Sequence, residues 1–204
     1  MLHAAVPATR VTPEEYLAFD RTSEISHEYV NGEIRAMTVG TRAHGVILTQ
    51  IASSLVSQLR GRPCDVISQA IRVGIPRMRN YLIPDVVVAC GGTQLEDDQH
   101  DTMLNPTVVI EVLSPSTENY DRGEKANMYR RIPSLKDYLL VSQAEPFVQH
   151  YRRFGEEGLW LLREIEGLDA SVELESIGCV LQMADIYERV FPAESTEASS
   201  AQEA

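Results

Sequence analysis

Two acidic residues stand inside segments that otherwise have the composition of buried β-strands. Asp85 follows Pro84 at the head of a run of three valines, and Glu111 interrupts the apolar run 108–113. An ionised carboxylate is costly to bury unless it is paired or holds a metal ion. Carboxylate oxygens suit Mg²⁺ or Mn²⁺, ions that polarise a phosphate and lower the pKa of an attacking water. The pair therefore predicts a metal site for phosphodiester hydrolysis, with Asp85 and Glu111 as ligands.

A site of this kind also benefits from a cation that orients the water or neutralises developing charge. The chain has only two lysines, Lys125 and Lys136. Lys125 follows both acids and falls in a segment typical of a helix, from which a long side chain can reach back over the strand ends. We predict a catalytic role for Lys125; a solvated ion pair with Asp121 or Glu124 is the alternative.

Two further polar residues are candidates for supporting roles. His44 is either metal-proximal or a polar group at the start of a helix, and the second interpretation is favoured because no partner ligands have matching spacing. Ser114 belongs to a Ser/Thr-rich loop that could bind phosphate through its backbone amides. Helix capping is the commoner role of such a loop and is favoured here.

Arginines are the candidates for contacts to a nucleic-acid backbone. The net charge of -12 and the pI near 4.8 argue against nonspecific binding to a polyanion, so a nucleic-acid role requires a local basic patch. Scattered surface positions are the alternative interpretation of these side chains. The candidates are Arg72, Arg77, Arg79 and Arg122.

The apolar pattern predicts the elements that position these residues. Thr12-Pro13 followed by Glu15 is typical of a capped helix start, and Asn31-Gly32 predicts a hairpin within residues 27–34. Apolar residues at every fourth position indicate a long helix over residues 42–59. The expected order that follows is strands at 66–73, 81–90 and 107–113, a helix at 121–131 and a strand at 138–141.

Shorter strands are predicted at 147–153, 159–164 and 171–174, as an antiparallel extension of the sheet. Length and composition favour one α/β domain, because 204 residues with 44% hydrophobic and 24% charged side chains are typical of a globular chain. We assign residues 11–192 to this domain and residues 1–10 to an N-terminal tail. Residues 193–204 contain no large apolar side chain, which predicts a disordered C-terminal tail.

Cellular location and cysteine chemistry can also be predicted. No apolar run is long enough to span a membrane and the N-terminus lacks signal-peptide features, which predicts a cytoplasmic protein without a membrane partner. The cysteines are odd in number and far apart, so we interpret them as small core residues and expect neither a disulfide nor a zinc site. They are Cys64, Cys90 and Cys179.

Three segments together resemble a known family, and they are residues 84–88, 109–117 and 121–125. They are similar to the Uma-two family of restriction endonucleases in the PD-(D/E)xK nuclease-like superfamily, and the resemblance runs from about residue 11 to residue 192. It implies a restriction-endonuclease-like core of helix, three strands, helix and strand, with a mixed sheet and extra antiparallel strands. The periodicity indicates the same order. The resemblance also implies that Asp85 and Glu111 are metal ligands.

The sequence departs from the superfamily pattern at two points. The lysine that normally follows the second acid by two residues is replaced by Leu113, and Lys125 is our proposed substitute. Many members place an acid on the first core helix, yet residues 42–59 contain no Asp or Glu. Glu28, Glu33 and His44 are the candidates for that role.

Two functional hypotheses follow. The leading one is a Mg²⁺- or Mn²⁺-dependent endonuclease that cleaves nucleic acid, with DNA as the expected substrate and homodimer formation left open. The alternative is a binding or assembly module that keeps the nuclease fold without turnover, because fold does not guarantee function. The displaced lysine, the missing helix acid and the net charge favour this alternative.

Overall fold

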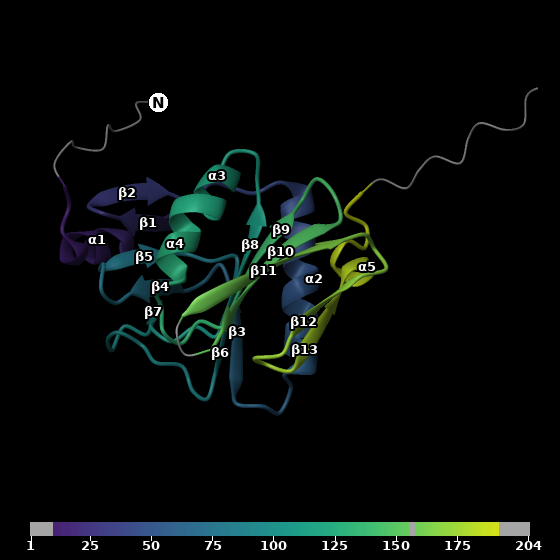
Figure 1. The fold of residues 1–204 in the computed structure, drawn as a ribbon. Coiled ribbons are helices and arrows are strands. Elements are labelled where there is room, and N and C mark those ends of the chain that lie inside the picture. Colours follow the sequence, from purple (N-terminus) through teal and green to yellow (C-terminus); the bar gives the residue numbers. More distant parts are fainter. Residues whose placement is uncertain (1–9, 156–157, 192–204) are drawn as a thin grey trace, which may run out of the picture.

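The computed structural model describes residues 10–155 and 158–191 of the chain (Figure 1). A six-stranded mixed sheet forms its centre. Its strands β8 and β9 are parallel, and its other neighbours are antiparallel. In spatial order the strands are β11 (Leu159–Glu166), β10 (Phe147–Phe154), β9 (Asp137–Ser142), β8 (Val108–Leu113), β6 (Val86–Cys90) and β3 (Cys64–Ser68).

Two smaller sheets accompany the central one. A five-stranded sheet consists of β2 (Glu33–Ala36), β1 (His27–Val30), β5 (Asn80–Leu82), β4 (Arg72–Ile75) and β7 (Thr102–Met103). A separate hairpin pairs β12 (Ser171–Leu174) with β13 (Cys179–Gln182). The helical segments are α1 (Pro13–Asp20), α2 (Arg42–Gln58), α3 (Glu118–Tyr120), the π-helix η1 (Asp121–Lys125), α4 (Ala126–Tyr129) and α5 (Met183–Ile186).

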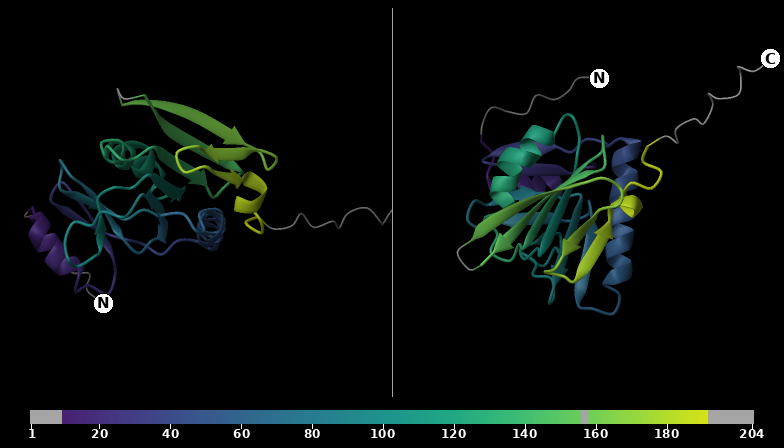
Figure 2. Two further views of the ribbon diagram at one scale, coloured as in Figure 1. Left: turned by 90° about the horizontal axis from the view of Figure 1, so that it is seen from below. Right: turned by 45° about the vertical axis from the view of Figure 1, so that its right-hand side comes forward.

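The two faces of the central sheet pack against different layers. On one face, Ile47, Ile51 and Leu55 of α2 join the strands in a core completed by β12, β13 and α5. On the other face, α4 and the five-stranded sheet form a second core with the strands. Figure 2 shows α2 and the β12–β13 hairpin on the side opposite to α1 and the five-stranded sheet. Alternation along β8 turns Val108, Ile110 and Val112 toward α2, so Glu111 faces the second layer.

The predicted fold class and the predicted core order are confirmed. The capped α1 begins after Thr12, whose side chain accepts from the Glu15 amide, and α2 covers almost the whole predicted range 42–59. The hairpin β1–β2 turns at Asn31 (φ 52°) and Gly32 (φ 93°), the left-handed values that such a turn requires. The parallel pair β8–β9 is separated by the helical segment 118–129, as a parallel connection requires.

Several predicted boundaries are wrong. The range 81–90 is not one strand: it breaks at Ile83-Pro84-Asp85, and β5 before the break joins the five-stranded sheet. The range 66–73 is likewise divided between β3 and β4, which lie in different sheets. Strand β12 pairs with β13 and does not extend the central sheet, unlike β10 and β11. Local patterns identify strands, whereas sheet membership depends on long-range pairing.

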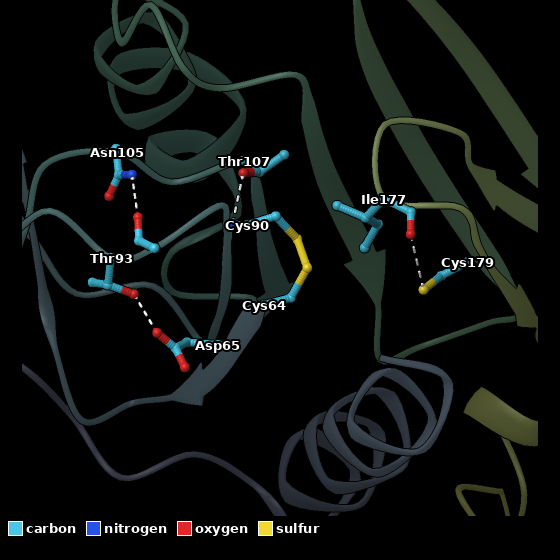
Figure 3. The surroundings of a disulfide bond; sticks show 9 residues. Cys64, Asp65, Cys90, Thr93, Asn105, Thr107, Ile177 and Cys179 are labelled. Atoms are coloured by element: carbon cyan, nitrogen blue, oxygen red, sulfur yellow. Dashed lines mark hydrogen bonds between the residues drawn. A yellow bond between two sulfur atoms is a disulfide. The ribbon is translucent and has the colours of Figure 1, made fainter. Parts of the chain in front are cut away.

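The cysteine prediction is also wrong in part. Cys64 and Cys90 form a disulfide with an S–S distance of 2.02 Å, while Cys179 is free and buried (Figure 3). The two residues are 26 positions apart, and the antiparallel register of β3 and β6 places them directly opposite each other. The predicted C-terminal tail and nearly all of the N-terminal one lie outside the described residues. Among the residues that the structure covers, no helix is long and apolar enough to cross a membrane.

Candidate active site

The break before β6 and the register of the central sheet bring the two predicted acids together. Val86 of β6 pairs with Ile110 of β8, so Asp85 and Glu111 occupy the next opposing positions. Glu111 points to the sheet face that is turned away from α2, whereas Asp85, in the break before β6, contacts His44 of α2. Asp85 and Glu111 are only 6% and 3% exposed, respectively. The structure therefore buries these two carboxylates close to each other.

Asp85 is held by hydrogen bonds at both carboxylate oxygens. Its Oδ2 atom accepts from the Val112 amide at 2.8 Å and lies 3.1 Å from Nε2 of His44. Its Oδ1 atom accepts from the side chain of Gln69 at 2.8 Å. Burial alone would raise the pKa of Asp85, but the contact with His44 and these donors outweigh it and lower the pKa. Asp85 is thus a fixed, ionised carboxylate.

Glu111 is far less satisfied. Its Oε1 atom lies 2.9 Å from Nζ of Lys125 but has no hydrogen-bond partner of suitable geometry within the described residues. Among the described residues, the Tyr129 hydroxyl is the other buried polar side-chain atom that has no hydrogen-bond partner. Burial raises the pKa of Glu111 well above its ordinary value; Lys125 opposes this shift, and the charge of Asp85 adds to it. This carboxylate retains capacity for a further ligand.

Lys125 lies at the centre of an acidic cluster. Its ammonium is 2.9 Å from Oε1 of Glu28, 2.9 Å from Glu111 and 3.8 Å from Asp121, and its side chain is only 4% exposed. Burial would lower the pKa of Lys125, but the three acids raise it well above the ordinary value. The residue belongs to η1, and a π-turn inside a helical segment is often found at functional sites.

Glu28 and Asp121 complete the cluster. Glu28 is fixed on β1 by the Ile83 amide at 3.1 Å and the Tyr120 hydroxyl at 3.1 Å. Asp121 begins η1, and burial raises its pKa. Of the three candidates for the missing helix acid, Glu28 and His44 lie at the site. Glu33 is 68% exposed and pairs with Arg35, so the structure places it outside.

Sequence reasoning missed two residues of the site. Asp121 stands one helical turn before Lys125. By itself, that spacing predicts only an ion pair on the surface of a helix. Gln69 follows β3 and reaches Asp85 through the pairing of β3 with β6, for which the local sequence holds no signal. Ser114 accepts from the Thr117 amide at 3.2 Å, so the structure places it in the turn that precedes α3.

The four predicted backbone-contacting arginines are dispersed. The structure does not support the predicted role of Arg72 as a contact to the phosphate backbone. This side chain is buried and paired with Asp20 and Asp101. Arg79 lies 2.5 Å from Glu14, and Arg122 lies 2.8 Å from Glu118, both in part-exposed pairs. Arg77 is exposed. The basic surface is therefore smaller than the sequence suggested.

The mixed central sheet, the helix on one face and the paired acids define a nuclease-like fold of the restriction-endonuclease class. The chain belongs to the Uma2 family, which is described as "Putative restriction endonuclease" and matches residues 13–184. A crystal structure described as a "putative nuclease belonging to DUF820", from Anabaena variabilis, has the same fold, with a TM-score of 0.73. Its sequence identity is 18%, and the match covers 89% of this chain and 99% of that one.

Two relatives come from Synechocystis sp. (strain ATCC 27184 / PCC 6803 / Kazusa). The uncharacterised protein slr1290 is 36% identical over 183 residues, covering 90% of this chain and 94% of that protein. The uncharacterised protein sll1609 is 30% identical over 169 residues, covering 82% and 95%. Both matches extend across most of the domain, which agrees with the family match.

The donor set suits a hard divalent cation. Carboxylate oxygens are the ligands that Mg²⁺ and Mn²⁺ prefer, and Oε1 of Glu111 is a buried acceptor without a hydrogen bond. In residues 10–155 and 158–191 as they are arranged, no three His, Cys, Asp or Glu side chains form a group that could hold a metal ion. The chemistry of the residues fits a cation, while the ammonium of Lys125 lies between two of the acids.

Proposed function

We propose that this protein is a metal-dependent endonuclease that hydrolyses phosphodiester bonds of nucleic acid, with DNA as the first substrate to test. The observation that carries the proposal is the convergence of Asp85, Glu111 and Lys125 in one buried cluster. Asp85 immediately precedes β6, Glu111 lies in the adjacent strand β8, and Lys125 lies in the helical segment that follows. Membership in a family described as restriction endonucleases supports the same activity.

Each residue has a distinct part in this proposal. Asp85 and Glu111 would hold Mg²⁺ or Mn²⁺, and the bound ion would polarise the phosphate and supply a nucleophilic water at neutral pH. His44 and Gln69 orient the carboxylate of Asp85. The ammonium of Lys125 can orient a water or neutralise charge that develops on the phosphate. Glu28, 2.9 Å from the Lys125 ammonium, is our candidate for the acid that the first core helix lacks.

The nucleic-acid substrate is negatively charged, and so is the protein, whose net charge is -12. Binding therefore requires local cations. We propose Arg77, Arg79 and Arg122 for contacts with the phosphate backbone. The proposal includes a cytoplasmic location. The Cys64–Cys90 disulfide counts against that location, because cytosolic reductants keep most cysteines as thiols.

The test is cleavage of plasmid DNA and of RNA by the purified protein with Mg²⁺ or Mn²⁺. Asp85→Asn keeps the size of the side chain and removes its charge, and we expect cleavage to fall at least about 100-fold. Asp65→Asn is the matched control, because Asp65 is exposed on the neighbouring strand β3 and should retain wild-type activity. Equal cleavage by wild type and Asp85→Asn, in a folded protein, would reject the proposal.

One observation favours an assembly role as the second candidate. Strand β11 forms one edge of the central sheet, and its side chains Leu159, Leu161 and Leu162 are 56%, 50% and 48% exposed. An exposed apolar edge strand is a template for pairing with another strand, and a second copy of this chain is the simplest partner. We propose to measure the mass of the wild type and of Leu161→Glu/Leu162→Lys by light scattering. A wild-type monomer would reject this role.

A further inference from the structure

The Lys125 ammonium occupies a position between acids that a divalent cation would also need. Its distances to Glu28 and Glu111 are both 2.9 Å, and it contacts Oε1 in each case. Asp121 is the third acid around it, at 3.8 Å, and Asp85 acts on Glu111 from the opposing strand. One buried ammonium thus faces three carboxylates, with a fourth close by. The carboxylates around Lys125 therefore outnumber its single positive charge.

We propose that Lys125 is an exchangeable counter-ion, whose ammonium competes with a divalent cation for Glu28 and Glu111. The inference rests on the proposed function, because it assumes that the acids bind a metal ion. In the metal-free protein the lysine neutralises part of the acidic cluster and keeps the domain folded. When the cation enters, the ammonium withdraws from these two carboxylates.

The surroundings of Lys125 make this exchange feasible. Its contact with Glu111 is an ion pair without the geometry of a hydrogen bond, so the positive charge of a cation can take its place there. Asp121 lies on the same helical segment, four residues earlier, and remains a partner for the withdrawn ammonium. The Ile83 carbonyl is 3.5 Å from Nζ and offers a second acceptor. The lysine can therefore leave the two acids without becoming an unpaired buried charge.

The same exchange links the two roles of the residue. Before metal binding, Lys125 stabilises acids that would otherwise repel one another. After withdrawal, its ammonium stays beside the acids, paired with Asp121, where a substrate phosphate would arrive. A lysine that acted only as a structural ion pair would support both the fold and the metal ligands, and its loss would weaken metal binding.

The experiment is calorimetric titration of Mn²⁺ into the wild type, Lys125→Met and Lys136→Met. We expect Lys125→Met to bind Mn²⁺ about tenfold more tightly than the wild type, because the competing charge is gone. Lys136→Met is the matched control, since Lys136 is the only other lysine and is exposed, and its affinity should equal that of the wild type. Unchanged or weaker binding by Lys125→Met would overturn the proposal, as would a failure of every variant to bind Mn²⁺.

A second variant covers the case in which Lys125→Met does not fold without metal. Lys125→Arg keeps the charge and can pair with carboxylates through two parallel hydrogen bonds, so it should be harder to displace. We expect it to bind Mn²⁺ about tenfold more weakly than the wild type. Binding equal to or tighter than that of the wild type would contradict the exchange. Because these measurements use no nucleic acid, they fail independently of the cleavage assay.

Discussion

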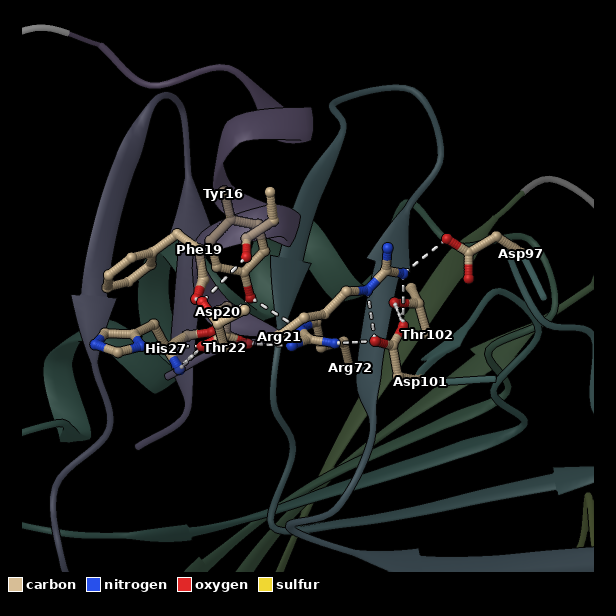
Figure 4. Close-up of polar contacts among 11 residues, drawn as sticks. Tyr16, Phe19, Asp20, Arg21, Thr22, His27, Arg72, Asp97, Asp101 and Thr102 are labelled. Carbon is tan, nitrogen blue, oxygen red and sulfur yellow. Dashed lines mark hydrogen bonds and ion pairs between the residues drawn. The ribbon is translucent and has the colours of Figure 1, made fainter. Parts of the chain in front are cut away.

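The domain contains two buried charge clusters that differ in how completely their charges are satisfied. In the first, Arg72 lies 2.9 Å from Asp20 and 2.9 Å from Asp101 and also reaches the Tyr16 hydroxyl at 3.2 Å (Figure 4). Asp20 in turn accepts from the backbone amide of His27 and lies 2.9 Å from its ring. This cluster joins α1 to β1, β4 and β7.

The cluster around Lys125 has the opposite character. In this cluster four acids share one lysine and His44. The cluster also contains both buried polar side-chain atoms that lack a hydrogen-bond partner in the described residues, on Glu111 and Tyr129. Charged groups that all have hydrogen-bond or ion-pair partners, as in the Arg72 cluster, fix a structure. Unsaturated acids cost stability unless a ligand completes them. The comparison therefore marks the Arg72 cluster as structural and the Lys125 cluster as the candidate site.

The largest expected effect is at Arg72. Arg72→Met leaves Asp20 as a buried charge without its cation, so the free energy of unfolding should fall by about 3–5 kcal/mol. Urea denaturation measures the loss, with Arg131→Met as an exposed control that should change little. Mn²⁺ affinity per folded molecule should be unaffected. A small loss of stability would mean that the Arg72 cluster is not structural, and the comparison would fail.

The sequence contained part of this contrast. Asp85 and Glu111 were predictable because acids inside apolar strands conflict with their local pattern. The burial of Arg72 is not predictable from the local sequence, because its partner Asp20 lies 52 positions earlier, at the end of another element. The long helix and the hairpin were predictable from periodicity and turn residues, whereas the β12–β13 pairing, the disulfide and the position of Gln69 follow from long-range register.

A smaller effect is expected at Glu111. A folded-state pKa above the unfolded value of 4.5 means that the native protein binds this proton more tightly, so stability falls as pH rises above 4.5. Glu111→Gln should remove that fall and raise the free energy of unfolding of the metal-free protein at pH 7 by about 1–2 kcal/mol, the order of one pKa unit. Urea denaturation between pH 5 and 8 is the measurement, and Mn²⁺ binding should be lost. A loss of stability at pH 7 would show that Glu111 is a structural partner, like Asp20.

The smallest effect concerns His44, whose ring lies 3.1 Å from Asp85. Asp85 raises the pKa of His44 above 6.5, so the charged pair contributes full stability below 6.5 and loses it as pH rises through the folded pKa. His44→Asn should therefore cost about 1 kcal/mol at acidic pH and less at alkaline pH. Urea denaturation at several pH values tests this, with His100→Asn as an exposed control. A cost that is constant with pH would mean that His44 holds Asp85 by a neutral hydrogen bond, and the acidic site would then depend on Lys125 alone for positive charge.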